Sequence, residues 1–279
     1  MNQHLIRSAS VVTLLTLLPA SAIGLVGCAS SYSTIEGQRS ASMPITDSSV
    51  ISVQSVNGDI QVIRGDDLTL SVEATIRARD EERLNATQIV TNHEADGSYS
   101  VSIAWPNNKR LNDEGADFFI TLPGVSELKL QSSNGAFRIE NLDAAVHART
   151  TNGSIRIIGP SRSIDAATSN GAIQLEGTVG PVTARSSNGR IRLLLAPENT
   201  GPVVLSTSNG NITLGVGPAF SGELAMTTSN GELNAKGFSS EHSPIHLESS
   251  RNSLRLGFGE AAHKSSLRTS NGTVTVQPL

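Results

Sequence analysis

The chain has 279 residues, of which 37% are hydrophobic and 16% charged, so it is long enough for one elongated domain or two small ones. The formal net charge of −4, without basic segments interleaved with aromatic residues, argues against a nucleic-acid partner. A single cysteine excludes an intramolecular disulfide.

Residues 1–27 have the layout of a secretory signal peptide. Arg7 lies in an initial segment without acidic residues, and an apolar run follows at 11–18. That run is too short to span a membrane as a helix. We therefore expect residues 1–27 to direct export and to be removed.

The segment Leu25-Val26-Gly27-Cys28 resembles the lipobox of bacterial lipoproteins. The resemblance implies that Cys28 becomes the N-terminus and is acylated, which would anchor the protein to a membrane of the cell envelope. For lipoproteins in general, the absence of an acidic signal at residues 29–30 implies the outer membrane, where the bacterium has one. The alternative is a buried free Cys28 in a longer apolar helix.

Residues 28–44 are rich in serine and lack apolar periodicity, so we expect a flexible tether after the lipidated cysteine. Residues 45–125 are expected to form a β-rich cap that covers the open strand edges of the following region. Its predicted strands lie at 68–78, 88–91, 99–105 and 116–122, with a helical turn at 80–84. The aromatic residues Tyr99, Trp105, Phe118 and Phe119 fit such a cap, and an aromatic sugar-binding platform is the alternative.

Residues 126–279 repeat one short pattern with a period of 18–21 residues, which is typical of a repeat architecture. The repeated pairs are Asn134-Gly135, Asn152-Gly153, Asn170-Gly171, Asn188-Gly189, Asn209-Gly210, Asn230-Gly231 and Asn271-Gly272, with an outlying copy at Asn57-Gly58. Apolar or small residues alternate on both sides of each pair, which predicts two half-buried strands joined at a corner. We expect the glycine to supply a positive φ there, and Asn252 to take its place in a degenerate copy.

Two all-β folds fit this pattern. In a single-stranded parallel β-solenoid each repeat is one coil, and the asparagines stack as a hydrogen-bonded ladder about 4.8 Å apart. In an antiparallel hairpin meander, Asn-Gly would be a two-residue turn. We favour the solenoid because stacked aliphatic residues fill a thin core, which agrees with the aromatic content of only 3%.

Basic residues recur at outward-facing positions of the repeats. They are Lys129, Arg138, Arg149, Arg156, Arg185, Arg190 and Arg192. On stacked coils they would form a basic stripe that could bind an anionic glycan or lipid headgroups. The alternative is a solvated face whose charges discourage aggregation at strand edges.

The sequence offers no recognisable catalytic set, so we predict that the protein is not an enzyme and uses no cofactor. His242 and His246 are four residues apart, but Pro244 lies between them, which excludes a helical metal pair. Asp165 stands alone among the outward positions of the repeats, so the paired carboxylates of a glycoside hydrolase are not apparent.

Several motifs together resemble a known bacterial family. They are Val56-Asn57-Gly58-Asp59-Ile60, the segment Ile120-Thr121-Leu122-Pro123, and the tandem Ser/Thr-Asn-Gly repeats. From about residue 45 to the C-terminus, the chain resembles the "putative adhesin" domain family, whose function is not known. The resemblance implies a β-solenoid, whereas Arg251-Asn252 departs from the Asn-Gly pattern.

We therefore expect a non-catalytic, lipid-anchored protein of the cell envelope that presents a solenoid surface for adhesion or envelope structure. Its partners would be the membrane and either a glycan or an envelope protein. An envelope-stress accessory protein that binds a membrane partner is one alternative. A glycan-active enzyme of the β-helix type is the other.

Overall fold

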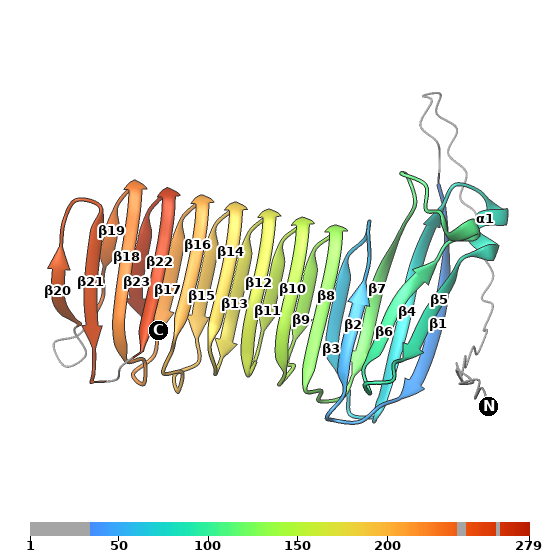
Figure 1. The fold of residues 1–279 in the computed structure, drawn as a ribbon, viewed down its shortest axis with the longest axis horizontal. Helices are drawn as coiled ribbons and strands as arrows, with labels where there is room; N and C mark the ends of the chain where they lie inside the picture. Colours follow the sequence, from blue (N-terminus) through green and yellow to red (C-terminus); the bar gives the residue numbers. More distant parts are fainter. Residues whose placement is uncertain (1–33, 239–243, 261–262) are drawn as a thin grey trace, which may run out of the picture.

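A computed structural model describes residues 34–238, 244–260 and 263–279. The described chain is almost entirely β-structure, arranged in an 11-stranded and a 12-stranded sheet, which we call sheet A and sheet B. Sheet A has the order β1-β4-β7-β3-β9-β11-β13-β15-β17-β23-β19, and sheet B has the order β20-β21-β18-β22-β16-β14-β12-β10-β8-β2-β6-β5. The two sheets lie face to face along an elongated body (Figure 1).

The N-terminal region joins parallel and antiparallel strands. Its elements are β1 (Ile35–Pro44), β2 (Val50–Gln54), β3 (Ile60–Arg64), β4 (Thr69–Ala78), α1 (Glu81–Ala86), β5 (Gln88–His93), β6 (Tyr99–Ala104), the short 3₁₀ helix η1 (Pro106–Asn108) and β7 (Gly115–Leu122). Strand β4 pairs antiparallel with β1 and β7, and β5 pairs antiparallel with β6. In both sheets these strands lie at one end of the repeat region.

Part of the expected tether is a strand. Residues 35–44 form β1, which pairs with β4 along its whole length from Ile35 opposite Ala78 to Pro44 opposite Thr69. The strand is at the edge of sheet A and its residues are exposed or half-buried. An edge strand of this kind needs few apolar residues, so its sequence lacks the alternation by which a buried strand is recognised.

The repeat region contributes one strand of each repeat to each sheet. Sheet B receives β8 (Glu127–Asn134), β10 (Ala145–Asn152), β12 (Ser163–Asn170), β14 (Val182–Asn188), β16 (Val203–Asn209), β18 (Gly222–Asn230) and β22 (Lys264–Asn271). Sheet A receives β9 (Phe137–Glu140), β11 (Ile155–Ile158), β13 (Ile173–Thr178), β15 (Ile191–Leu195), β17 (Ile212–Val216), β19 (Leu233–Ala235) and β23 (Val274–Pro278). Neighbouring strands of these sets pair in parallel, with Asn152 opposite both Asn134 and Asn170. Such registers agree with stacked coils, whereas the meander would pair successive arms antiparallel.

The last repeat does not stack at the end of the body. Strand β22 lies between β16 and β18 in sheet B, and β23 lies between β17 and β19 in sheet A. The degenerate copy instead contributes to an antiparallel hairpin of β20 (Ile245–Ser249) and β21 (Ser253–Phe258), which covers the outer edge of β18. The stacking order therefore differs from the order of the repeats in the sequence.

The core between the sheets is a continuous layer of aliphatic side chains. In one repeat Ile164, Ala166, Ile173 and Leu175 are at most 2% exposed. Equivalent positions of the other repeats are buried in the same way, which confirms the period-two alternation seen in the sequence. At the C-terminal end an aromatic cluster is formed by Phe258, which packs against Phe220 and Phe238 with ring centroids 5.2 and 5.7 Å away.

The four aromatic residues of the N-terminal region do not share a face. Phe118 is buried in the core, whereas Phe119 on the same strand of sheet A is 38% exposed. Tyr99 and Trp105 pack against the core on the side of sheet B, and the Tyr99 ring stacks on His93 at 4.5 Å. This distribution suits a cap and does not form an aromatic platform.

Candidate functional site

The corner at the end of each sheet-B strand carries a column of asparagine side chains. The side-chain N–H of each asparagine donates to the side-chain oxygen of the one before it, over 2.7–2.9 Å. The order along the column is Asn57, Asn134, Asn152, Asn170, Asn188, Asn209, Asn271 and Asn230. The predicted ladder is therefore present in the structure, but Asn271 precedes Asn230 because the last repeat is inserted.

The corner glycines are needed for a different reason from the expected one. A Cβ atom on Gly171 would lie 2.0 Å from the carbonyl oxygen of Gly153, and the same overlap of 1.9–2.2 Å recurs at Gly135, Gly153, Gly189, Gly210, Gly231 and Gly272. Among the corner glycines that the structure describes, only Gly58 and Gly272 have φ in the left-handed range, at 153° and 155°. Close approach of one backbone to the next thus excludes side chains at this position.

The expectation for Asn252 is also wrong. It is not among the described non-glycine residues with positive φ, which are Asn107, Asn108 and Asn141. Asn252 lies in the turn of the antiparallel β20–β21 hairpin and is not stacked on another corner. Glycine is therefore not required there.

A second ladder lies just inside the first. At six of the eight corners the hydroxyl group two residues before the asparagine donates to the glycine carbonyl of the preceding rung, as Thr168 does to Gly153 over 2.9 Å and Ser186 to Gly171 over 3.0 Å. The exceptions are Ser55, which donates to the Ala116 carbonyl, and Ser132, whose hydroxyl group has no partner among the described residues. The residues that carry the six bonded hydroxyl groups are buried. Each bond therefore gives a buried hydroxyl group and a glycine carbonyl group a hydrogen-bond partner. The side-chain amides and inner hydroxyl groups of the corners are thus largely engaged in holding the rungs together.

The predicted basic stripe is divided between the two sheets. Lys129, Arg149 and Arg185 lie on β8, β10 and β14 of sheet B, whereas Arg138, Arg156 and Arg192 lie on β9, β11 and β15 of sheet A. Arg190 follows the corner between β14 and β15. The sequence pattern could not show this division because both arms of a repeat alternate in the same way.

On sheet A two of the three basic side chains, Arg138 and Arg156, have local partners. Arg138 forms an ion pair with Glu140 at 2.5 Å, and Arg156 donates to the Gln174 side-chain oxygen over 2.7 Å. Arg138 and Arg156 face each other on the adjacent strands β9 and β11. These contacts are consistent with a solvated, charge-paired face.

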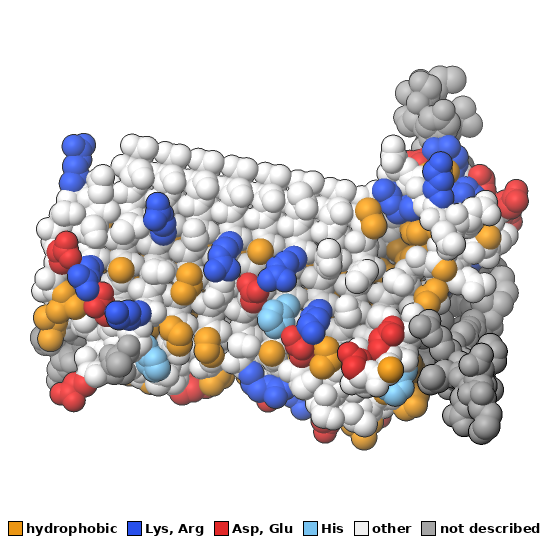
Figure 2. Space-filling view, viewed as in Figure 1, with side chains coloured by type: hydrophobic (Ala, Val, Ile, Leu, Met, Phe, Trp, Pro, Cys, Tyr) orange, Lys and Arg blue, Asp and Glu red, His pale blue; other side chains and the backbone are white. Residues whose placement is uncertain are grey.

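The outer face of sheet B holds a denser group of charges, here called the central cluster and consisting of Glu127, Lys129, His147, Arg149 and Asp165. Glu127 lies 3.1 Å from the Lys129 amine and 3.0 Å from Nε2 of His147. Asp165 lies 2.6 Å from the Arg149 guanidinium and 3.7 Å from Nδ1 of His147. Basic, acidic and histidine side chains gather near the middle of this face (Figure 2).

A surface hollow adjoins the central cluster. Its lining residues are Ser52, Lys129, Leu130, Gln131, His147 and Arg149. The short Ser52 side chain on β2 faces Lys129 on β8, and this difference in length leaves space above the sheet. The hollow can admit a small polar group, with basic and amide donors at its border.

A row of three arginines continues from this hollow along sheet B. Arg149, Arg185 and Arg268 each stand three residues before a ladder asparagine, on β10, β14 and β22. The intervening strands β12 and β16 carry Ala167 and Ser206 at the same level. Sequence analysis missed Arg268, although its spacing from Asn271 matches the other two; only the insertion of β22 brings it into the row.

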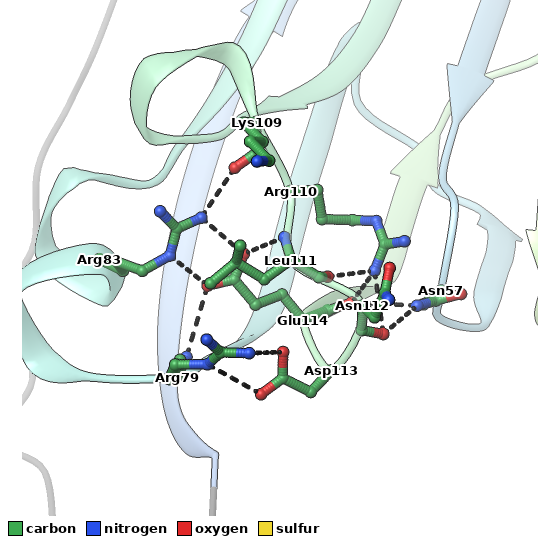
Figure 3. A network of polar contacts seen from close by, with 9 residues as sticks. All are labelled: Asn57, Arg79, Arg83, Lys109, Arg110, Leu111, Asn112, Asp113 and Glu114. Atoms are coloured by element: carbon green, nitrogen blue, oxygen red, sulfur yellow. Dashed lines mark hydrogen bonds and ion pairs between the residues drawn. The ribbon is translucent and has the colours of Figure 1, made fainter. Parts of the chain in front are cut away.

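A polar network fixes the N-terminal end of the asparagine ladder (Figure 3). The carboxylate of Glu114 is fully buried and accepts from the Arg83 guanidinium over 2.5 and 2.7 Å, and from the Leu111 backbone N–H over 2.8 Å. The side chain of Asn57 donates to the carbonyl groups of Asn112 and Glu114, both at 3.2 Å. The network therefore connects helix α1 to the first rung of the ladder.

The pKa of Glu114 reflects two opposing effects. Burial raises it, but the hydrogen bonds from Arg83 and from the backbone N–H groups of Leu111 and Arg79 outweigh burial and hold it below the ordinary value. The hydrogen bond to Glu114 is likewise the main reason that the pKa of Arg83 is raised. Both groups are thus charged at neutral pH, and their role in this position is structural.

Some of the residues named in the sequence analysis lie outside the described chain. Cys28 and the signal peptide at 1–27 lie outside the described residues, as does His242. In the described ranges no cluster of three histidine, cysteine, aspartate or glutamate side chains could hold a metal ion. The described residues also include no helix with the length and hydropathy needed to cross a membrane.

Comparison with known proteins gives matches among solved structures only; no protein-family model and no curated protein matches the chain. A "putative adhesin" of Bacteroides fragilis is 12% identical with a TM-score of 0.46, and the match covers 87% of this chain and 97% of that one. A "putative cell adhesion protein" of Clostridium sporogenes is 12% identical with a TM-score of 0.37, covering 88% and 100%. A "putative adhesin" of Parabacteroides distasonis is 9% identical with a TM-score of 0.38, covering 87% and 97%.

Proposed function

We propose that the protein is a non-catalytic component of the bacterial cell envelope, anchored by an acylated Cys28, whose repeat region is a parallel β-solenoid that presents a binding surface. The observation that supports this most is the continuous asparagine ladder, in which eight corners are joined by side-chain hydrogen bonds of 2.7–2.9 Å. A ladder of this kind makes a long, rigid body whose outer faces are free for contacts.

The position of the proposed anchor gives this body a direction. Cys28 precedes Ile35, where β1 begins, by only a few residues. Strand β1 is at one end of sheet A, and the β20–β21 hairpin is at the opposite end of the body (Figure 1). In the proposed arrangement the N-terminal cap lies near the membrane and the repeats extend away from it.

The central cluster supports binding in preference to hydrolysis. Its two carboxylates, Glu127 and Asp165, are each engaged by basic side chains at 2.6–3.1 Å. A glycoside hydrolase needs two carboxyl groups that face the same glycosidic bond, one of them protonated. We therefore propose adhesion to a glycan or an envelope protein as the role of the surface, with the outer membrane as its location in a bacterium that has one.

Replacement of the proposed anchor tests this function. Cys28→Ser removes the thiol that the lipid would modify, so the protein should move from the membrane fraction to the soluble fraction and lose incorporation of labelled fatty acid. Ser31→Ala is a matched control and should leave both properties unchanged. Persistence of Cys28→Ser protein in the membrane pellet would contradict the lipoprotein proposal.

A further inference from the structure

The arginine row, consisting of Arg149, Arg185 and Arg268, is regular in a way that the other charged groups are not. Its members occupy alternate strands of one sheet, in the order β10, β14 and β22. Because neighbouring strands are about 4.8 Å apart, successive arginines start about 10 Å apart. Basic side chains follow one another along this face of the body (Figure 2).

The row is exposed and carries excess positive charge. The side chains of Arg149 and Arg185 are 63% and 58% exposed, and Arg268 is also exposed. Within the part of the chain that the structure describes, Asp165 is the one acidic partner of the row, at 2.6 Å from Arg149 and 3.8 Å from Arg185. Arg268 forms no ion pair within the described residues. Its positive charge is therefore not neutralised, whereas Asp165 partly neutralises Arg149 and Arg185.

The positions between the arginines are small. Ala167 and Ser206 stand at the same level of the sheet and do not rise between the guanidinium groups. Uncharged polar residues continue the row at both ends, with Gln131 before Arg149 and Thr227 after Arg268. An extended ligand could thus lie along the row, with an anion at each arginine and uncharged hydroxyl groups between them.

We infer that the arginine row binds a linear polysaccharide with one carboxylate or sulfate on every second sugar. Guanidinium groups bind such anions through two parallel hydrogen bonds, which favours arginine over lysine at each contact. Successive arginines are about 10 Å apart, which is two strand spacings of the sheet. This distance is comparable to the length of an extended disaccharide. This inference rests on the proposed function, since an anchored envelope protein meets such polymers outside the cell.

The inserted last repeat is essential to this surface. If the repeats stacked in sequence order, β18 would follow β16 and place Thr227 where Arg268 now stands. Arg268 would then stand three strands from Arg185, and the spacing of two strands between arginines would end at Arg185. Insertion of β22 therefore adds a third arginine to the row at the same spacing, and with it one further anion site.

Binding of the full-length protein, purified in detergent, to immobilised hyaluronan tests the inference, because hyaluronan carries one carboxylate per disaccharide. The triple variant Arg149→Gln, Arg185→Gln, Arg268→Gln should bind about tenfold more weakly, as three exposed ion pairs are lost. Binding of the unmodified protein should also weaken as salt is raised, because salt screens exposed charges. Neutral dextran should not bind.

The opposite sheet offers a control with the same change in charge. Arg138→Gln, Arg156→Gln and Arg192→Gln together remove three positive charges from sheet A and should leave hyaluronan binding within about twofold. Both triple variants should keep the melting temperature of the unmodified protein within a few degrees. Equal weakening by the two triple variants would overturn the inference, since it would indicate a general effect of net charge.

Two further variants separate spacing from charge. Arg185→Ala combined with Ser206→Arg keeps the charge but moves the middle arginine by one strand, so hyaluronan binding should fall. Asp165→Asn removes the carboxylate that competes for Arg149 and Arg185, so binding should become stronger. Unchanged binding in both variants would contradict recognition by the row.

The remaining outcomes distinguish this inference from the proposed function. Failure of the unmodified protein to bind hyaluronan, or a preference for anionic phospholipid vesicles over hyaluronan, would overturn the inference. Membrane fractionation of Cys28→Ser would still report on the envelope proposal. Shortening of hyaluronan during the assay would contradict the non-catalytic proposal while supporting the ligand class.

Discussion

The repeat region and the N-terminal region both place two sheets face to face, but they are held together differently. Between residues 127 and 278, the same contacts recur at most rungs: a side-chain bond between asparagines, a hydroxyl bond to a glycine carbonyl and a layer of aliphatic residues. Between residues 35 and 122, the contacts are individual, such as the buried ion pair of Arg83 with Glu114. A repeated contact contributes a little at many positions, whereas an individual contact concentrates its contribution in a few residues.

The largest expected effect is disruption of a rung in the middle of the ladder. Gly171→Val places a Cβ atom where the Gly153 carbonyl oxygen lies 2.0 Å away, so two backbone segments must separate. We expect a loss of more than about 3 kcal/mol in the free energy of unfolding, measured by urea denaturation.

Thr183→Val is the control for this substitution. Thr183 lies on β14 with its side chain on the outer face, and a change there should cost no more than about 0.5 kcal/mol. Similar stabilities for the two variants would contradict the role of close backbone approach at the corner.

The next effect concerns the individual contacts of the N-terminal region. Glu114→Gln removes the charge that pairs with Arg83 at a fully buried position, so the free energy of unfolding should fall by about 3 kcal/mol. Asp113→Asn is a neighbouring control, because its ion pair with Arg79 is partly exposed to solvent and should therefore contribute much less to the free energy of unfolding. A larger loss of unfolding free energy for Asp113→Asn than for Glu114→Gln would show that burial does not determine how much an ion pair contributes to stability.

The same carboxylate predicts a dependence of stability on pH. The pKa of Glu114 is lower in the folded protein than its ordinary value of 4.5, so its contribution is complete above about pH 4.5. The contribution should be lost as the pH falls from that value through the lower pKa of the folded state. Urea denaturation at several acidic pH values should therefore show a smaller loss for Glu114→Gln than for the unmodified protein.

The smallest effect is expected for a single ladder side chain. Asn170 both donates to Asn152 over 2.8 Å and accepts from Asn188 over 2.9 Å, whereas Asn230 at the end of the column donates only to Asn271. Asn170→Ala should cost about 1 kcal/mol in urea denaturation, and Asn230→Ala about half as much. Equal costs would indicate that the bonds act independently of position in the ladder.

The sequence predicts the arms of the repeats well because burial on one face imposes a period of two on residues such as Ile164, Ala166, Ile173 and Leu175. It does not predict which repeats are neighbours. Equivalent positions form equivalent contacts, so Asn209 can bond to Asn271 in the same way as to any other ladder asparagine.

The candidate site is predictable only in part for the same reason. Alternation shows that Arg149, Arg185 and Arg138 face outward, but both sheets of the body have an outer face, and only the pairing assigns each arginine to one of them. The buried position of Glu114 depends on Arg83 and Leu111, which lie elsewhere in the chain and have no repeat to reveal them. Local patterns thus give the strands, whereas contacts between distant segments decide the surfaces.

The insertion of β22 and β23 also affects the order in which the rungs of the body can form during synthesis and export. A chain delivered from its N-terminus forms the rungs from Asn134 to Asn209 in series, each on the preceding one. The rung between Asn209 and Asn230 is supplied by Asn271, which follows both of them in the sequence. The interior of the body is therefore closed only after β22 and β23 have been delivered, so a chain truncated before β22 lacks a middle rung and not merely its tip.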